Sequence, residues 1–263
     1  MKGENMAKMW FPMFLFMLLT VGSAEAGQFG SIKPAAKIGQ ISQEVGYFWS
    51  HGDWAADDKD FDDADITQSE VYIQAGYGLS DDWETYFRVG AADFKIKDPI
   101  PDEFVDNEDF DMEDDLKPFV TLGARGLFYR GSFFNLGAFV QGSYFSSYDD
   151  KKTVELAAGT TSLKMDFRDH WAVNAGVALQ AEVGGFSAYV GPILYFSRGT
   201  LDFEASALGI TETRSSTYEE HNNLGAVAGI SVPVSGVGTL CFEGQYRNKI
   251  SVGGAFIYLR LNH

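Results

Sequence analysis

The chain has 263 residues, and its 37 acidic against 20 basic side chains give a formal net charge of −17. This balance argues against nucleic acid as a partner, because phosphates require a clustered basic surface. Aromatic residues make up 15% of the chain, which excludes a largely disordered protein. A single cysteine excludes a disulfide framework and a cysteine-rich metal site, and nothing in the composition points to a cofactor.

The N-terminus has the three parts of a secretory signal peptide. Lys2 and Lys8 lie in the first part, Trp10 to Val21 form an apolar stretch, and Ser23 to Ala26 supply small residues for cleavage. Twelve helical residues span about 18 Å, too short for a bilayer core of about 30 Å. We therefore expect residues 1–26 to be a cleaved signal peptide and residues 27–263 to form one domain without internal boundary.

Amphipathic strands are the dominant pattern after residue 26, where apolar and polar residues alternate with a period of two. The longest example runs from Phe167 to Val183, with apolar residues at most odd positions. Pro192 would remove a ladder hydrogen bond from its strand, so a bulge or local break is expected there. Ten such strands are predicted, around 38–50, 71–79, 83–91, 120–128, 135–141, 167–183, 186–197, 223–232, 239–247 and 254–261.

The connections between these strands alternate in length. Ser80 to Asp82, Arg130 to Ser132, Gly184–Gly185 and Pro233 to Gly238 indicate hairpin turns. Long links are expected between them at 51–67, 93–117, 147–166 and 200–221. All short turns would then lie at one end of the sheet and all long links at the other, as in an up-and-down meander.

The alternative is a soluble β-sandwich, whose outward face would be rich in lysine, glutamate and threonine. Here the polar face is dominated by glycine, serine, asparagine and glutamine, which suits a narrow, partly wet lumen. Aromatic residues flank the strands at both ends, as in the girdles of membrane barrels: Trp83, Phe133, Phe134 and Phe186 at the short turns, and Trp49, Tyr144 and Trp171 opposite. The predicted fold is all-β, a closed antiparallel up-and-down transmembrane β-barrel of ten strands, with eight as the alternative.

Charged residues on the polar faces nearly cancel, which predicts ion pairs inside the barrel, where low dielectric makes an unpaired charge costly. The lumen ion-pair candidates are Glu44, Glu70, Glu84, Glu182 and Glu243 with Arg88, Arg125, Arg168, Arg247 and Arg260. Cys241 is expected to be a small buried residue.

Two of the long links are strongly acidic. Residues 51–67 contain seven aspartates, and residues 93–117 contain eleven acids against three lysines. Neither has the glycine or the ligand order of an EF-hand loop. We expect no firm metal site, with solvated repulsive loops as one interpretation and weak divalent-cation binding as the other; the weak cation candidates are Asp57, Asp58, Asp60, Asp62, Asp63, Asp109, Asp111 and Glu113.

The hairpin GLSDDWETYFRVGAAD (Gly78 to Asp93) and the closing GGAFIYLRL (Gly253 to Leu261) resemble the small bacterial outer-membrane β-barrel superfamily, in the broad OmpA-type, porin-like sense. The resemblance covers nearly the whole of residues 27–263 and is diagnostic of architecture rather than of one activity. The chain departs from it at Leu261-Asn262-His263, where members commonly carry a terminal aromatic residue. No peptidoglycan-binding domain is expected after the barrel, unlike in two-domain members.

No catalytic residues are predicted. An omptin-like protease would need an acid and a histidine on one strand face, whereas Asp169 and His170 are adjacent and point to opposite faces. A lipid-modifying enzyme would need a serine and a histidine at the outer leaflet, and no recognisable motif contains them. His170 is expected to be a hydrogen-bonded interior group.

The expected function is therefore structural or porin-like, in a bacterial outer membrane reached by secretion, with a lumen largely filled by polar and paired charged side chains. The partners would be outer-membrane lipid and lipopolysaccharide, with divalent cations as a further candidate, and the protein would be a monomer. The alternatives are a surface module that binds a cation, a polysaccharide or a protein through its outer loops, and a lipid-modifying enzyme.

Overall fold

The computed structural model describes residues 29–58, 63–97, 111–156, 159–207, 210–220, 223–234, 238–247 and 250–261. The expected signal peptide, 1–26, lies outside these ranges. In the described part no helix is long and apolar enough to cross a membrane. The strands are β1 Ile41–Ala56, β2 Ala64–Gly78, β3 Trp83–Lys97, β4 Met112–Arg130, β5 Phe134–Phe145, β6 Tyr148–Leu156, β7 Gly159–Val183, β8 Phe186–Ala207, β9 Ile210–Glu220, β10 Leu224–Val234, β11 Gly238–Tyr246 and β12 Ile250–Leu261.

The sheet closes on itself, because β1 pairs antiparallel with both β2 and β12. The circuit of pairings runs β1-β2-β3-β4-β5-β7-β8-β10-β11-β12 and returns to β1, ten strands in all. The described β6 and β9 lengthen two of these positions: β6 continues the pairing of β5 along β7, and β9 continues that of β10 along β8. The predicted closed antiparallel barrel is confirmed.

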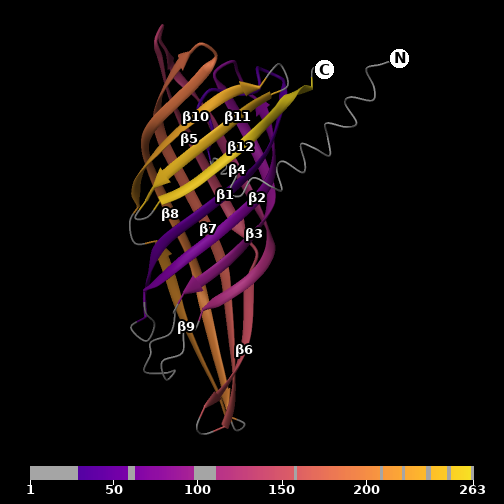
Figure 1. Cartoon of the computed structure of the whole chain (residues 1–263), viewed down its shortest axis with the longest axis vertical. Helices are drawn as coiled ribbons and strands as arrows, with labels where there is room; N and C mark the ends of the chain where they lie inside the picture. Colours follow the sequence, from indigo (N-terminus) through magenta and orange to yellow (C-terminus); the bar gives the residue numbers. More distant parts are fainter. Residues whose placement is uncertain are drawn as a thin grey trace, which may run out of the picture.

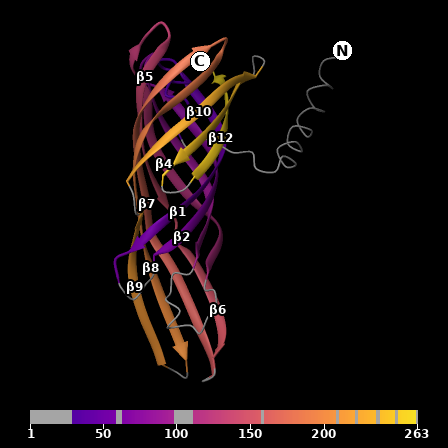
Figure 2. The ribbon, with the colours of Figure 1, turned by 60° about the vertical axis from the view of Figure 1, so that its left-hand side comes forward.

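A long β-extension projects beyond one end of the barrel (Figure 1, Figure 2), built from β6, β9 and the adjoining parts of β7 and β8. The strand β7 alone has 25 residues. At about 3.3 Å per residue it would reach about 80 Å, far more than a bilayer requires. The long links expected at 147–166 and 200–221 are therefore wrong as loops. They are mostly strand, because their residues continue the ladder of the barrel wall.

The outside of the wall carries an apolar band. Exposed side chains of this band come from nearly every strand, and include Val71, Ile73, Phe87, Val89, Leu122, Val140, Val177, Val190, Leu194, Ile230 and Phe242. The aromatic residues expected at its two edges are on the surface: Trp83, Phe133, Phe134 and Phe186 near the short turns, and Tyr144 and Trp171 at the opposite edge are exposed, while Trp49 is half-buried.

Toward the extension, the outside of the wall changes from apolar side chains to ion pairs. The Lys117 ammonium lies 3.0 Å from Asp114 and 3.3 Å from Asp149, and Arg168 pairs with Asp202. Arg198 and Glu219 form another exposed pair at 3.2 Å. This change at one level along the barrel axis divides the wall into a belt suited to lipid and an extension suited to water.

A bulge in β7 separates these two parts. The register with β8 shifts between Arg168 and Trp171, and Asp169 has a positive φ of 54°. Phe167 and His170 are therefore both buried, while Arg168 and Asp169 are both exposed. Uninterrupted alternation from Phe167 to Val183 was predicted, and this is wrong, because the extra residue in the bulge reverses which parity faces inward.

The predicted turn at Gly184–Gly185 is confirmed as a two-residue hairpin turn, with φ of 60° and 92°. Residues that carry a side chain would be strained at these positions. Pro192 interrupts the ladder as expected. The pairs of β7 with β8 stop at Gly176–Ile193 and resume at Leu179–Val190, while the register on both sides is the same. The proline therefore breaks pairing locally without a bulge.

Candidate functional site: the barrel interior

The interior of the barrel is filled at three levels. At the short-turn end it holds an apolar cluster that includes Phe29, Ile32, Phe139 and Tyr195. The middle level is polar and charged. Toward the extension a second apolar cluster, built around Trp54, Phe94, Tyr148 and Phe167, occupies the space between the strands. Phe94 stacks on both Tyr148 and Phe167, with ring centroids 4.8 and 4.6 Å apart.

Arg125 is the centre of the strongest charged cluster in the middle level. One guanidinium nitrogen, Nη2, lies 3.0 Å from a Glu84 carboxylate oxygen and 3.5 Å from one of Glu44. All three side chains are at most 2% exposed. Glu44 also accepts hydrogen bonds from the Tyr72 hydroxyl and the Gln74 amide. Such density of partners offsets the desolvation cost of burying these charges.

Arg88 also belongs to the polar middle level, on the side nearer the extension. Its Nε and Nη2 donate to the Gln74 carbonyl oxygen at 3.2 and 2.8 Å. The guanidinium carbon stands 3.8 Å from the centroid of the Tyr72 ring, which adds a cation–π contact. Glu70 is buried nearby, and its carboxylate interacts electrostatically with Arg88 and Arg247.

A segment before the first strand, residues 29–36, runs inside the short-turn end. The Glu243 carboxylate accepts hydrogen bonds from the backbone N–H groups of Phe29 (3.3 Å) and Gly30 (3.0 Å). Arg125 Nη1 donates to the Phe29 carbonyl, and Glu84 accepts from the Ala36 N–H at 2.8 Å. The Phe29 ring stacks on Phe139 with centroids 4.0 Å apart. Nothing in the sequence alternation signalled this inner segment.

Seven of the ten predicted lumen residues are buried inside the barrel: Glu44, Glu70, Glu84, Glu243, Arg88, Arg125 and Arg247. Glu182 is instead exposed at the rim, where it pairs with Lys33 at 2.9 Å. Arg168 is exposed on the extension because of the bulge beside it. The side chain of Arg260 lies outside the described ones.

Glu220 is a buried carboxylate that the sequence analysis missed. It lies in β9, within a stretch expected to be a loop. Counting it, the buried charged side chains in the described part are five carboxylates (Glu44, Glu70, Glu84, Glu220, Glu243) and three guanidiniums (Arg88, Arg125, Arg247). The expected balance of five against five is therefore wrong for the described interior, which has an excess of negative charge. Cys241 is buried as predicted, with its Sγ 3.2 Å from Ser231 Oγ.

The acidic residues proposed as weak cation ligands are engaged with protein groups where the structure describes them. Asp57 accepts from the Thr217 N–H at 2.7 Å, Asp63 accepts from the Ala56 N–H, and Asp111 and Glu113 pair with Lys95. Asp58 has an interaction of its own, and Asp60, Asp62 and Asp109 lie outside the described residues. Within the described ranges no three His, Cys, Asp or Glu side chains are grouped to hold a metal.

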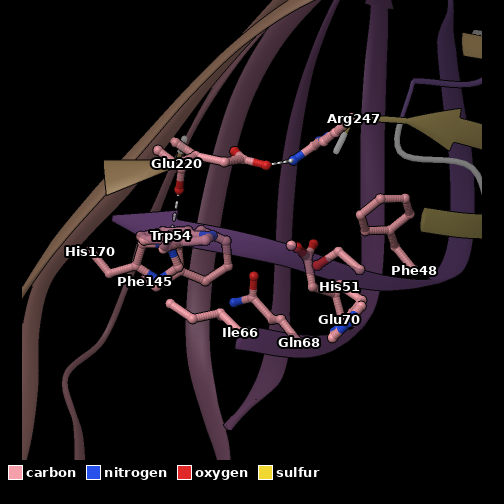
Figure 3. Close-up of a pocket in the computed structure, with 14 residues that line it drawn as sticks. Phe48, His51, Trp54, Ile66, Gln68, Glu70, Phe145, His170, Glu220 and Arg247 are labelled. Atoms are coloured by element: carbon pink, nitrogen blue, oxygen red, sulfur yellow. Dashed lines mark hydrogen bonds and ion pairs between the residues drawn. The ribbon is translucent and has the colours of Figure 1, made fainter. Parts of the chain in front are cut away.

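One cavity of about 30 Å³ lies between the polar middle level and the apolar cluster toward the extension (Figure 3). Its lining includes Phe48 and Trp54 from β1, Gln68 and Glu70 from β2, and Phe145, His170 and Ser197 from β5, β7 and β8. Glu220, whose strand β9 pairs with β1 at Trp54, and Arg247, which follows β11, complete this set. Arg247 Nη1 lies 3.7 Å from Glu220 Oε1. The described interior thus contains a polar hollow beside the apolar cluster.

His170 is an interior group, as predicted. It is 1% exposed, stacks on Phe145 with ring centroids 4.3 Å apart, and its Nε2 lies 3.3 Å from Ser197 Oγ. The Ser197 hydroxyl donates to the Trp171 carbonyl at 3.3 Å. Asp169 is exposed beside Arg168, so it does not share a face with His170.

No protein-family model and no curated protein sequence matches this chain. Among solved structures, the translocator domain of the autotransporter NalP from Neisseria meningitidis is 11% identical, covers 86% of this chain and 90% of its own, and has a TM-score of 0.49. The outer membrane protease OmpT from Escherichia coli is 10% identical, with 88% and 98% covered and a TM-score of 0.41. The β domain of the Bordetella autotransporter BrkA is 12% identical, with 84% and 99% covered and a TM-score of 0.35.

Proposed function

We propose that this protein is a structural β-barrel of a bacterial outer membrane, which anchors a rigid β-extension on the outer surface. Lipid and lipopolysaccharide would contact the apolar band between the two aromatic levels. The exposed ion pairs that begin at Lys117 and Arg168 suit water on the far side of that band. A monomer suffices, because the closed circuit of pairings leaves no edge strand within the described part of the band.

One observation carries this proposal: the interior is occupied at all three levels. Residues 29–36 fill the short-turn end, ion pairs around Arg125 fill the middle, and stacked aromatic rings around Phe94 fill the end toward the extension. A barrel of about eight strands has an interior just wide enough for side chains, so ten strands add little room. A porin-like role as an open pore is therefore disfavoured relative to a structural one.

Electrical recording in planar lipid bilayers tests this proposal. Barrels purified in detergent, with their folding verified by heat-modifiable gel mobility, should show small or no conductance. Large, steady channels in the unmodified protein would mean that solute passes through the lumen, and would replace the structural role by a transport role. Membrane fractionation of expressing cells tests the location separately, with recovery in the inner-membrane or soluble fraction as the contrary result.

A surface binding module is the second candidate, and the extension favours it. Solvent-facing charges of both signs lie on β6 to β9, including Lys164, Glu204 and Glu212, on a frame of continuous strands. Such a frame suits a protein or polysaccharide partner outside the membrane. We propose no enzymatic role for the chain, and release of fatty acid from labelled lipopolysaccharide by the folded barrel would contradict this.

A further inference from the structure

The cavity beside Glu70 and Glu220 contains unused hydrogen-bond acceptors. Glu220 is 8% exposed, and its Oε2 has no hydrogen-bond partner among the described residues, while its Oε1 is 3.7 Å from Arg247. Glu70 is 4% exposed and lines the same cavity. Figure 3 shows Glu220 and Arg247 on one side of the cavity and Glu70 across from them.

His170 supplies a third acceptor. The Ser197 hydroxyl proton is donated to the Trp171 carbonyl, so the Ser197 oxygen accepts from His170 Nε2–H. In a neutral imidazole the other nitrogen, Nδ1, is then an acceptor. This Nδ1 is buried without a partner among the described residues, and the side chain lines the cavity. An unpaired buried polar atom is costly, which makes a bound donor favourable here.

The size and the lining residues of the cavity indicate which hydrogen-bond donor group it can hold. The cavity measures about 30 Å³. A water-sized group needs about 10–15 Å³ of such volume, so two or three non-hydrogen atoms fit. Two carboxylates face one guanidinium in the lining, which favours a cation. The Trp54 ring also lines the cavity, and an aromatic ring attracts an ammonium group more than it attracts water.

Part of β1 forms one wall of the cavity. The strand β1 pairs with β12 up to Trp49 and with β9 from Trp54 onward. Between these two stretches of pairing, Ser50 and Gly52 line the cavity.

From these observations we propose that the cavity binds the terminal ammonium group, –CH₂–NH₃⁺, of a small primary amine. The three N–H donors of the ammonium are matched by the carboxylates of Glu70 and Glu220 and by His170 Nδ1. The remainder of the amine lies against Ser50 and Gly52, which line the cavity. This site is independent of whether the lumen conducts ions, so it stands apart from the structural role proposed above.

The test uses the whole barrel in detergent micelles, with methylammonium as the probe and calorimetry as the readout. Methylammonium should bind in the millimolar range, while tetramethylammonium, which has the same charge and no N–H donor, should not. Glu70→Gln and Glu220→Gln should each weaken binding at least about tenfold, since each removes a charge-assisted hydrogen bond. Glu182→Gln, which alters an exposed carboxylate at the other end of the barrel, should leave binding unchanged.

Equal binding of tetramethylammonium or K⁺, or binding unaffected by both glutamine variants, overturns the proposal. Should these variants fail to fold, Gly52→Leu decides: a β-carbon at Gly52 stands 3.5 Å from Glu220 Oε1, so the larger side chain fills the cavity and should abolish binding. On the unmodified protein, a nuclear Overhauser contact between the methylammonium methyl group and the Trp54 indole is expected. Its absence under saturating probe also overturns the proposal.

Discussion

At the scale of single residues, buried charged side chains strongly affect the stability of the barrel interior. Arg125 connects two carboxylates, Glu84 and Glu44, and the backbone carbonyl of Phe29 within one fully buried cluster. A buried pair of this kind contributes little compared with apolar packing, yet removing one partner leaves a charge with no solvent to stabilise it. The intact pair therefore adds little to the free energy of unfolding, whereas the loss of one partner lowers it strongly.

Replacing Arg125 by alanine leaves Glu84 buried without its counter-charge, which should lower the free energy of unfolding by about 3–5 kcal/mol. Arg130→Ala is the matched control, since Arg130 pairs with Asp82 at a half-exposed site, and should cost no more than about 1 kcal/mol. Urea titration of the folded barrel in detergent measures both. Similar losses in the two variants would show that water screens the Arg125 cluster.

At the scale of elements, the inner segment 29–36 is tied to the wall by hydrogen bonds to its backbone. Glu243 holds its beginning and Glu84 holds its end. The Glu243 carboxylate also accepts from the Tyr189 hydroxyl and the Gln245 amide, so four donors converge on it. A short irregular segment can thus be as firmly fixed as a strand.

The Gly30 amide, which donates to Glu243, should accordingly exchange slowly with deuterium. Glu243→Gln should accelerate its exchange by about tenfold, because an amide oxygen is a weaker acceptor than a carboxylate. The Ala36 amide, which is bonded to Glu84, is the control within the same segment. Nuclear magnetic resonance in micelles resolves both positions. Unchanged exchange at Gly30 would mean that the apolar contacts of Phe29 hold the segment without Glu243.

In the β-extension, ionised carboxylates stabilise the pairing of strands by accepting hydrogen bonds. The Thr217 N–H hydrogen bond lowers the pKa of Asp57 below its usual value of 3.8, and this bond joins the end of β1 to β9. Burial raises the pKa of Asp202, but the hydrogen bonds from Arg168 and Ser215 and the charges of Arg168 and Lys164 together outweigh it, so that pKa also falls below 3.8. For a carboxyl with a lowered folded-state pKa, stability is present above the unfolded value and is lost as the pH falls through the folded one.

Protection of the Thr217 amide should therefore be constant from neutral pH down to the usual carboxyl pKa of 3.8 and decline below it, after correction for intrinsic exchange rates. In Asp57→Asn the decline should largely disappear, because no proton is taken up at that position. Hydrogen exchange measured over a series of pH values checks both variants. Equal protection of the unmodified protein at pH 3 and pH 6 would show that strand pairing alone holds β1 against β9.

At the scale of the whole molecule, the two ends of the barrel differ. Short turns close one end, with the inner segment beneath them, and the β-extension projects from the other (Figure 2). Ion pairs such as Lys117–Asp149 and Arg198–Glu219 cover the wall on the extension side of the apolar band, while the short-turn side carries the rim pairs Lys33–Glu182 and Arg130–Asp82. This polarity predicts a single orientation in the membrane, with the extension outside the cell.

Labelling of single cysteines by a membrane-impermeant maleimide on intact cells tests this orientation, in a background with Cys241→Ser. Cysteines at the exposed positions Lys151 and Glu204 of the extension should react. Cysteines at Asp81 and Ser132, near the short turns, should react only after the membrane is permeabilised. The reverse pattern would mean that the barrel is inserted the other way round.

The sequence by itself determined the ten strands of the barrel wall, most of their faces and the closed barrel. Alternation placed Ile73 outside and Gln74 inside, and a glycine pair marked the turn at Gly184–Gly185. This works because a period of two follows from the backbone of any strand. A wall with an apolar outside and a narrow polar lumen makes the two faces chemically distinct.

Seven buried charged residues of the lumen were predicted, but only the tertiary structure decided their partners and their level along the barrel axis. Local alternation does not give the height of a side chain along the barrel axis, so it could not separate Glu182 at the rim from Glu84 beside Arg125. The bulge at Asp169, the burial of Glu220 and the inner segment at Phe29 each depend on partners far away in sequence, such as the 213 positions between Gly30 and Glu243. Closure of the ring brings such residues together, because it fixes the register of every strand at once.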